Sequence, residues 1–454
     1  MINLNTKKRI HMIAIKGAGV SGLAQILKGL GHNVSGSDTA DTFFTDKILK
    51  KTDICVKTPF SVKNIPQNID LAISSMAYLK SDNIEIKELK KRKIPIFGYA
   101  NALGSIFNQY YGIAIAGTHG KSTVSAMIAY ILEQAGLEPF ALIGAELLNW
   151  KSNARISKKL QANQQISRPK NIFQINNKKQ DSYFEQSKKQ ESYFVIEADE
   201  YKEQFLNYKP NIIVLTDIDF DHPDYYKNKK AYKNAFKKFI KNIKRNGVII
   251  KNNKLISKNY DLQLIGKHNQ RNANLAYLTC KKLGIQDKVI KKALIKFKGT
   301  RRRLEKVGKF KNATVIDDYA HHPTEVKASL LALKKEYPNK ELVVLFHPHT
   351  FSRTKEFLKE FAKSLEIADK IYLLDIYSSS REKHSNITSD DIIKNIKKEA
   401  KNLKTILYAI KFFKKNLSSK QVLVTMGAGN VCNVAYSLCS QLKPLTNSKL
   451  AIAR

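Results

Sequence analysis

Residues 117–123 (GTHGKST) constrain the fold of this chain more than any other segment. The apolar run before them, residues 113–116, predicts a buried strand, and residues 121–134 predict a helix. Gly117 and Gly120 allow backbone N–H groups to turn toward a phosphate, and the helix N-terminus adds the positive end of its dipole. A strand, a glycine-rich loop and a helix in this order predict a parallel α/β domain that binds a phosphate group.

The side chains of this loop suit nucleotide chemistry. Lys121 can reach the β- and γ-phosphates, and the hydroxyl of Ser122 is a suitable ligand for Mg²⁺. The complete phosphate-loop pattern has a glycine where this chain has Ile115, so the loop is a variant. A chance glycine turn is the competing interpretation, and the order of strand, loop and helix argues against it.

The length of the chain, 454 residues, predicts about three domains. Short apolar runs alternate with helical stretches, which is typical of a parallel α/β sheet. A helix opens at residues 17–22 and runs to residue 30. Strands are predicted at residues 10–16, 33–35, 193–198, 212–216, 342–346, 371–374 and 422–425. We place the domain boundaries near residues 108 and 298, which gives domains over 1–108, 109–297 and 298–454.

The net charge is +40, from 79 Lys and Arg against 39 Asp and Glu. Basic residues that neutralise phosphates gain affinity for nucleic acid by releasing counterions. The competing interpretation is a compositional bias, because Lys, Asn and Ile are abundant throughout the sequence. No groove-reading element accompanies the charge. We therefore expect weak attraction to anionic surfaces and no specific nucleic-acid partner.

The sequence also indicates where the protein resides. No apolar run approaches the roughly 18 residues of a membrane span, and the N-terminus lacks the apolar core of a signal peptide. The cysteines are not arranged as CxxC pairs, which argues against a disulfide framework or a zinc site. Their positions are Cys55, Cys280, Cys432 and Cys439. We expect a cytoplasmic protein without a membrane span.

Two segments depart from the α/β pattern. Residues 151–192 are rich in Gln, Asn and Lys and repeat KKQDSYF (178–184) as KKQESYF (188–194), so we expect a polar insertion that forms a surface loop. Residues 225–260 carry many basic residues and no acidic one. Apolar side chains recur there at helical spacing, which predicts a helix with one face on the core and its lysines in water. This stripe comprises Tyr232, Ala235, Phe236, Phe239, Ile240 and Ile243.

Acidic residues follow two of the predicted strands. Residues 197–200 (EADE) follow one strand, and residues 219–222 (DFDH) come shortly after another. Because the carboxyl ends of parallel strands share a crevice with the phosphate loop, these groups predict a metal–nucleotide site. Glu197 can supply an oxygen ligand to a hard cation, and a second metal could use His222.

A second glycine pattern lies near the N-terminus. Gly17, Gly19 and Gly22 form GxGxxG, with Asp38 about twenty residues on. The pattern shows only that a pyrophosphate can approach a helix N-terminus. Taken by itself it suggests NAD, and a different pyrophosphate-containing ligand fits it as well.

Eight motifs resemble the Mur ligases in their order and spacing. They are GTHGKST, EADEY, DFDHPDYY, IGKHNQRNA (265–273), FKGTRRRLE (297–305), IDDYAHHPTE (316–325), FHPHTFSRT (346–354) and MGAGNV (426–431). The opening IKGAGVSGLAQIL also matches, so the resemblance extends from residue 10 to about residue 431. It implies an N-terminal Rossmann-like domain for a UDP-sugar, a central P-loop ATPase with a parallel sheet, and a C-terminal Rossmann-like domain.

The resemblance also implies a reaction. ATP phosphorylates the carboxylate of the sugar to an acyl phosphate, and the amine of an amino acid then attacks and expels phosphate. The substrates implied are UDP-N-acetylmuramate and L-alanine, with Mg²⁺ as the metal. In such a phosphoryl transfer the protein mainly positions anions and neutralises charge. We expect a monomer or a homodimer.

Roles for individual residues follow from the resemblance. The catalytic charges are Lys121, Arg303 and His222, and the metal ligands are Ser122, Glu197 and His222. The ATP-binding residues are Gly117, Thr118, His119, Gly120, Lys121, Ser122, Thr123, His268, Asn269, Arg303 and Asp318. The UDP-sugar residues are Gly17, Gly19, Gly22, Ser37 and Asp38.

The residues implied for the carboxylate of alanine are His349, Arg353 and Arg381, with surface salt bridges as the alternative for the arginines. His321 and His322 lie beside Asp318, and a turn at the start of a helix is the alternative role for at least one of them.

Other functions stay open at this point. A recycling ligase that joins a whole peptide to the UDP-sugar fits EADEY, and a non-enzymatic nucleic-acid-binding derivative of the fold is a weaker alternative. The chain departs from the family at Asp217, where Asn is usual, and in a shortened connection over residues 223–265. Some members support the second metal with a carbamylated lysine, and no lysine here is assigned to that role.

Overall fold

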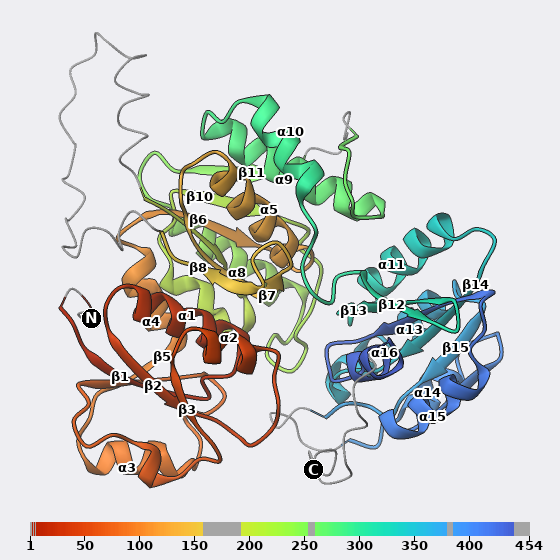
Figure 1. Ribbon diagram of the computed structural model, residues 1–454, viewed down its shortest axis with the longest axis horizontal. Coiled ribbons are helices and arrows are strands. Elements are labelled where there is room, and N and C mark those ends of the chain that lie inside the picture. Colours follow the sequence, from red (N-terminus) through yellow and green to blue (C-terminus); the bar gives the residue numbers. More distant parts are fainter. Residues whose placement is uncertain are drawn as a thin grey trace. The chain divides into compact units, whose positions relative to one another are not determined.

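The structure is a computed structural model that describes residues 2, 4, 6–157, 192–252, 259–378 and 385–439. The chain divides into two compact units. The first unit comprises Met1–Phe220, Asn228–Gln263 and Gln270–Thr300, and the second comprises Asp221–Lys227, Leu264–Asn269 and Arg301–Arg454. Three sheets, made almost wholly of parallel strands with helices packed around them, confirm the predicted α/β class (Figure 1). Two of these sheets lie in the first unit.

The N-terminal sheet is entirely parallel and has the strand order β3-β2-β1-β4-β5. Its strands are β1 (Arg9–Ile13), β2 (Asn33–Ser37), β3 (Cys55–Lys57), β4 (Leu71–Ser74) and β5 (Ile96–Gly98). Its helices are α1 (Ala18–Gly29), α2 (Thr45–Lys51), η1 (Val62–Asn64), α3 (Ile84–Lys91) and α4 (Tyr99–Phe107). The strand order reverses beside β1, so the glycine-rich turn after β1 opens at the position where such sheets bind ligands.

The central sheet has the order β11-β10-β6-β9-β7-β8. Its strands are β6 (Tyr111–Ala116), β7 (Phe140–Leu147), β8 (Ser152–Arg155), β9 (Tyr193–Glu197), β10 (Ile212–Leu215) and β11 (Val248–Lys251). Its helical elements are α5 (Lys121–Gln134), η2 (Tyr201–Asn207), α8 (Lys229–Lys241), α9 (Lys267–Lys282) and α10 (Asp287–Lys296). The neighbouring strands β6, β9 and β10 run parallel, so their carboxyl ends bring residues 117–123, 197–200 and 217–219 to one edge.

The structure corrects the predicted start of the polar insertion. Residues 151–192 were expected to form a loop, but β8 lies within that range and pairs antiparallel with β7. Asn153 in β8 is fully buried, donates to the carbonyl of Ala18 at 2.6 Å and accepts from Gln25 at 2.9 Å. Figure 1 shows α1 against β7 and β8. The first residues of the expected insertion therefore anchor α1, and residues 158–191 lie outside the described part of the chain.

The C-terminal sheet has the order β12-β13-β17-β14-β15-β16, parallel except for β12. Its strands are β12 (Glu305–Phe310), β13 (Ala313–Asp318), β14 (Glu341–Phe346), β15 (Lys370–Leu373), β16 (Ala400–Asn402) and β17 (Gln421–Met426). Its helices are α11 (Pro323–Glu336), α12 (Phe351–Glu356), α13 (Leu358–Leu365), α14 (Ser389–Ile393), α15 (Ile406–Asn416) and α16 (Cys432–Cys439). The carboxyl ends of β13, β14 and β17 lead into residues 318–322, 347–350 and 427–431.

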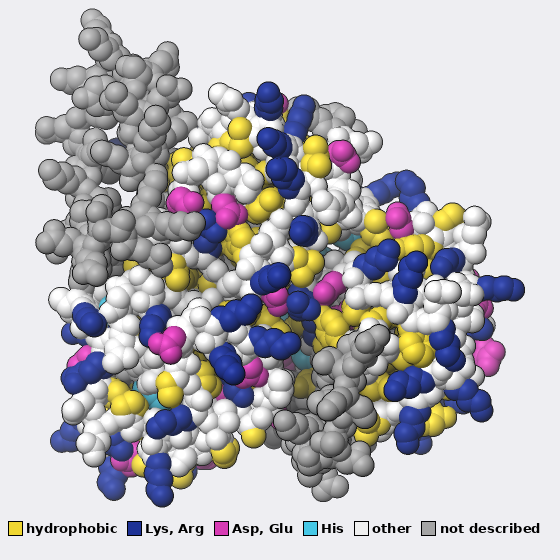
Figure 2. Space-filling view, in the orientation of Figure 1, with side chains coloured by type: hydrophobic (Ala, Val, Ile, Leu, Met, Phe, Trp, Pro, Cys, Tyr) yellow, Lys and Arg dark blue, Asp and Glu magenta, His cyan; other side chains and the backbone are white. Residues whose placement is uncertain are grey.

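Within the basic segment over residues 225–260, α8 forms the predicted amphipathic helix, although Ile240 is only half-buried and Ile243 lies beyond its end. Tyr232, Ala235, Phe236 and Phe239 are buried. The lysines of the helix lie mostly at exposed positions. Figure 2 shows Lys and Arg side chains scattered over the visible face rather than gathered in one patch. In the described part of the chain, every helix is too short or too polar to cross a membrane.

Candidate active site

The phosphate loop joins β6 to α5 in a backbone conformation that requires glycine. Gly117 has φ +136° and Gly120 has φ +77°, both in the region that disfavours other residues. A Cβ on Gly117 would collide with the side chain of Thr216, and one on Gly120 would lie 2.5 Å from Asn272. Gly120 caps α5, whose helix begins at Lys121. The loop thus opens the helix N-terminus toward the edge where the strands end.

The segment that follows β10 holds this loop in place. The amide of Thr118 donates to the carbonyl of Asp217 at 2.7 Å. The hydroxyl of Thr118 donates to the carbonyl of Asp219 at 2.6 Å and accepts from the amide of Asp219 at 2.9 Å. Nε2 of His119 lies 3.4 Å from the carboxylate of Asp219. The contact with Asp217 uses its backbone, so the departure from the family's usual Asn leaves this hydrogen bond intact.

Lys121 lies over the loop and pairs with a buried carboxylate. Its Nζ donates to the carbonyls of Gly117 at 2.6 Å and Thr118 at 3.2 Å, and lies 2.9 Å from Oε2 of Glu200. Glu200 is 1% exposed. Burial lowers the pKa of Lys121, but the charges of Glu200 and Asp199 outweigh it and raise that pKa above its ordinary value. The lysine therefore carries a positive charge at the phosphate loop at neutral pH.

Two oxygen ligands meet beside this lysine. The hydroxyl of Ser122 donates to Oε2 of Glu197 at 3.1 Å, and the amide of Gly144 donates to Oε1 at 2.6 Å. A Cβ on Gly144 would lie 2.9 Å from that carboxylate, so the glycine leaves room for it. A hydroxyl and a carboxylate suit Mg²⁺, because this ion prefers oxygen ligands. Its remaining ligands usually come from water and from substrate phosphates. The structure brings together Lys121, Ser122 and Glu197.

The second unit carries Asp318 at the end of β13. Asp318 is 3% exposed, and within the described residues its Oδ2 has no hydrogen-bond partner. Burial raises the pKa of Asp318 to about 6. A buried carboxylate oxygen without a partner is costly and suits a group that receives a hydrogen bond from a ligand.

The neighbours of Asp318 have partners of their own, and Arg303 and His321 share Glu325. Arg303 stacks 5.1 Å from the ring centre of Tyr319 and lies 3.7 Å from Glu325. His321 lies 3.5 Å from Glu325, and burial lowers the pKa of His321 to about 4. His322 accepts from the amide of Thr324 and caps α11, so it has the alternative role at the start of a helix.

Arg353 forms a buried ion pair within the second unit. Its Nε lies 2.9 Å and its Nη2 3.2 Å from the two carboxylate oxygens of Asp221. Its Nη1 lies 3.3 Å from Nδ1 and from the carbonyl of His349. Burial raises the pKa of Asp221, but the charges of Arg353 and His222 hold it well below its usual range. Arg353 was predicted to bind the carboxylate of alanine, and in this structure its guanidinium binds the carboxylate of Asp221.

The remaining predicted residues of the second unit are placed as follows. His222 has φ +57° and its Nε2 lies 3.7 Å from Asp221. Asn269 is buried and donates to the carbonyl of Ile265 at 2.8 Å, and His268 is half-buried beside Gly266. Arg381 lies outside the described residues. The roles of these residues toward ATP, metal and amino acid stay predictions.

The glycine-rich turn of the first unit is packed closely. A Cβ on Gly19 would lie 2.8 Å from the phenol oxygen of Tyr99, and one on Gly22 would lie 3.0 Å from Leu142. Gly17 caps α1. Asp38 accepts from the amide of Lys16 at 2.7 Å and is buried, so it fixes the turn that carries these glycines. Gly22, the third glycine of the pattern, allows α1 to pack closely on β7 of the central sheet.

Ser37 ends β2 with its side chain turned inward. This side chain is fully buried and donates to Glu85, a residue of α3 that also accepts from the amide of Ser61 at 2.9 Å. The hydroxyl of Ser37 is therefore engaged with Glu85, and the contact of Ser37 with the UDP-sugar stays a prediction. This burial depends on a partner 48 residues away in the sequence.

Sequence reasoning missed two residues of the phosphate site. In the sequence Glu200 is only one member of EADE, and Tyr232 is only one member of an apolar stripe. The hydroxyl of Tyr232 lies 2.8 Å from that of Thr118 and donates to Glu200 at 3.2 Å. A buried tyrosine requires a partner for its hydroxyl, and this rule was the available signal for Tyr232.

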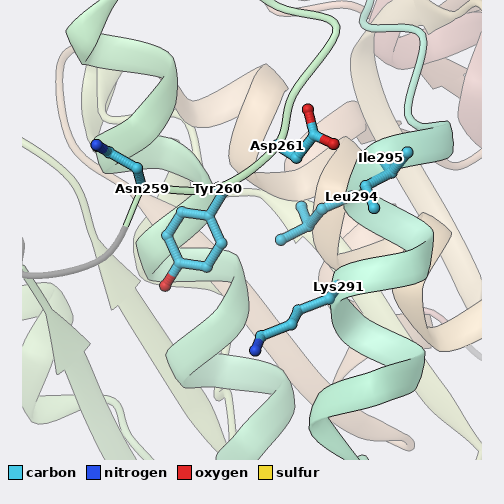
Figure 3. A pocket seen from close by; sticks show the side chains of 6 residues that line it. All are labelled: Asn259, Tyr260, Asp261, Lys291, Leu294 and Ile295. Carbon is cyan, nitrogen blue, oxygen red and sulfur yellow. The ribbon is translucent and has the colours of Figure 1, made fainter.

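A separate pocket of about 360 Å³ lies on the first unit. Figure 3 shows the ring of Tyr260 and the side chain of Lys291 facing the same space beside Leu294. Its lining comprises Asn259, Tyr260, Asp261, Lys291, Leu294 and Ile295. None of the predicted site residues lines it, so we assign the candidate active site to the phosphate loop.

Comparison with known proteins gives a consistent result over nearly the whole chain. Residues 9–111 match the description "Mur ligase family, catalytic domain", residues 115–259 the "Mur ligase middle domain", and residues 302–429 the "Mur ligase, glutamate ligase domain". The chain is 32% identical to the UDP-N-acetylmuramate–L-alanine ligase of Borreliella burgdorferi, over 94% of this chain and 98% of that relative.

Two solved structures share the fold. The UDP-N-acetylmuramate–alanine ligase of Thermotoga maritima has a TM-score of 0.75 at 23% identity and covers 95% of this chain and 98% of its own. A murein peptide ligase of Psychrobacter arcticus has a TM-score of 0.69 at 21% identity and covers 98% and 100%. At these identities the likeness supports the fold rather than the substrate.

Proposed function

The chain belongs to the Mur ligase family, and we propose that it is an ATP-dependent ligase that joins L-alanine to UDP-N-acetylmuramate. The observation that carries the chemistry is the meeting of Lys121 with Ser122 and Glu197 at the carboxyl ends of β6 and β9. The relatives that share this name, similar over nearly their whole length, support the choice of substrates.

The reaction proceeds in two steps. A carboxylate oxygen of the sugar attacks the γ-phosphorus of ATP, the bond to ADP breaks, and an acyl phosphate forms. The amine of L-alanine then attacks the acyl carbon, loses a proton and expels phosphate, which leaves an amide. Bound Mg²⁺ would neutralise charge on the phosphates and orient them.

The residues of the first unit suit the first step. Lys121 places its ammonium at the phosphate loop, where charge shifts from the γ-phosphate to ADP. Ser122 and Glu197 would hold Mg²⁺, and Gly144 fixes the orientation of that carboxylate through its amide. The backbone amides at the start of α5 face the same edge and favour anions.

We assign the remaining contacts as part of this proposal. Arg303 adds charge at the γ-phosphate, His222 supports a second metal, and Asp318 accepts from the ribose. His268 and Asn269 lie near adenine, and the turn over Gly17 and Gly19 receives the pyrophosphate of the UDP-sugar. His349 and Arg381 receive the carboxylate of alanine, and Arg353, which is paired with Asp221, lies beside His349. Because ATP and UDP-sugars are cytoplasmic metabolites, we propose the cytoplasm as the place of action.

The test measures phosphate release from ATP with UDP-N-acetylmuramate and one amine at a time. The amines are L-alanine, glycine, L-serine and a murein tripeptide. We expect release that depends on both the sugar and an amino acid, with the highest kcat/KM for L-alanine. A preference for the tripeptide would instead assign the recycling reaction, and absence of release with every amine would contradict the proposed function.

A further inference from the structure

Tyr232 lies in α8 with its ring in the core and its hydroxyl in the phosphate site. The residue is 1% exposed, and its ring packs against Phe236 at 5.1 Å and Phe220 at 6.0 Å between centroids. Its hydroxyl lies 2.8 Å from Oγ1 of Thr118 and donates to Oε1 of Glu200 at 3.2 Å. A single side chain thus joins the phosphate loop to the acidic residue behind it.

Glu200 depends on this contact because it is buried. Its Oε1 accepts from Tyr232 and lies 3.3 Å from Nζ of Lys121, and its Oε2 lies 2.9 Å from the same nitrogen. A carboxylate removed from water needs hydrogen bonds as well as an opposite charge to stay ionised. Tyr232 supplies one of those hydrogen bonds.

Thr118 extends the connection to the next segment of the site. Besides Tyr232, its hydroxyl bonds to the backbone of Asp219 through both the carbonyl and the amide. Tyr232 therefore contacts two segments of the site directly, residues 117–123 and 197–200, and reaches a third, residues 217–219, through Thr118.

We propose that Tyr232 is a positioning residue of the nucleotide site. Its hydroxyl fixes Glu200 and Thr118, so that Glu200 holds the Lys121 ammonium at the loop until the phosphates of ATP replace that carboxylate. This inference rests on the proposed function, because it assigns the ligand that takes over Lys121. Tyr232 itself touches no substrate in this account.

The exchange has a simple physical basis. Lys121 has three N–H donors, which it uses on two backbone carbonyls and Glu200. ATP supplies an anion that takes the place of Glu200. A Glu200 that moves freely would leave the ammonium in several positions, and ATP would have to order it on binding.

The test compares Tyr232→Phe with the wild-type protein. Phe keeps the ring packing and removes the hydrogen bond to Glu200 and the polar contact with Thr118. We expect the Kd for MgATP, measured by calorimetry, and the KM for ATP to rise about five- to twentyfold. The KM for UDP-N-acetylmuramate should stay within about twofold, a split that general loss of folding would not produce.

Tyr110→Phe is the matched control, because Tyr110 has a half-buried ring in the same unit that packs on Phe140 and Phe194. It should leave both KM values unchanged. The role of Glu200 is tested in the background of Glu200→Gln. In that background Tyr232→Phe should raise the Kd for MgATP by about threefold or less, because Glu200→Gln has already removed part of the effect.

The outcomes separate the two proposals. Wild-type protein that neither binds ATP nor releases phosphate would contradict the proposed function. An active wild type with a Tyr232→Phe variant of unchanged ATP affinity would overturn the positioning role. If Tyr232→Phe raised the Kd for MgATP equally in the wild-type and Glu200→Gln proteins, the part assigned to Glu200 would be overturned.

Discussion

Lys121 and Glu200 form a buried ion pair at the phosphate loop, with Nζ 2.9 Å from Oε2. Glu200 is 1% exposed, and the side chain of Lys121 is 17% exposed. The lysine is thus charged and held at the loop. This relationship links the loop after β6 to the acidic segment after β9.

Lys121→Ala should abolish ligation. The loss of a positive charge at the transferring phosphoryl group lowers kcat by at least about a hundredfold. The variant also leaves Glu200 buried without its cation, so thermal unfolding should begin at a lower temperature. The double variant Lys121→Ala/Glu200→Gln lacks that unpaired buried charge, so the loss of ligation can be measured on a folded protein. Lys241→Ala, an exposed lysine of α8, is the control, and near wild-type turnover of Lys121→Ala would refute the assignment.

The polar insertion should be dispensable only beyond β8. Replacement of residues 160–188 by a short Gly/Ser linker should leave activity within a few-fold, because loop length adds closure entropy only logarithmically. A replacement that begins at residue 153 removes Asn153 and its bonds to α1, so it should lower stability. Thermal unfolding and turnover of both variants decide the matter. A folded 160–188 variant that binds ATP and fails to ligate would show that the insertion serves the site.

Asp318→Asn should stabilise the second unit above pH 6. The folded pKa of Asp318 is about 6, above the usual value of 3.8, so the folded state binds the proton more tightly. Stability therefore falls as pH rises from about 4 to about 6 and stays lower above it. At pH 8 the variant should gain about 1–3 kcal/mol, and at pH 4 it should resemble the wild type. Urea unfolding at both pH values tests this, and equal stabilities at pH 8 would contradict it.

Arg353→Met should destabilise the second unit strongly. It leaves Asp221 buried without its cation, which costs about 3–5 kcal/mol. Because the folded pKa of Asp221 is depressed, the pair stabilises the protein above the usual pKa near 3.8 and ceases to do so as pH falls further. Lys394→Ala breaks the exposed ion pair with Asp391, leaves the contacts of Asp391 with Thr388 in place, and should cost under about 1 kcal/mol. Similar unfolding midpoints for the two variants would contradict the stabilising role of the ion pair between Arg353 and Asp221.

The high net charge should produce only nonspecific binding to DNA. Exposed lysines act through an attraction that salt screens, so affinity should fall steeply between about 50 and 200 mM salt without a preferred sequence. Fluorescence anisotropy with unrelated duplexes measures both effects. Sequence-selective binding at physiological salt would restore the nucleic-acid interpretation.

Local signals explain why part of the site could be predicted from the sequence. The apolar run before Gly117 and the glycines at 117 and 120 fix β6, the loop and α5 within a few residues. Glu197 follows from its place at the end of an apolar strand. These features depend on neighbours in the sequence, and the backbone conformation at Gly117 admits few other residues.

Contacts between distant segments explain what the sequence left open. β8 has the polar sequence SNAR, and it is a strand because β7 and α1 satisfy its polar groups. Ser37 turns inward because Glu85 lies opposite it. Tyr232 reaches Glu200 across 32 residues of sequence. Helical spacing predicted the buried ring of Tyr232, and it carried no information on the partner of the hydroxyl.

An isotope label tests whether the reaction passes through an acyl phosphate. UDP-N-acetylmuramate labelled with ¹⁸O in its carboxylate is incubated with ATP, L-alanine and the protein, and the released phosphate is analysed by mass spectrometry. Each phosphate should carry one oxygen from the carboxylate, and one amide product should form per phosphate. Unlabelled phosphate, or release that proceeds without L-alanine at the same rate, would contradict it.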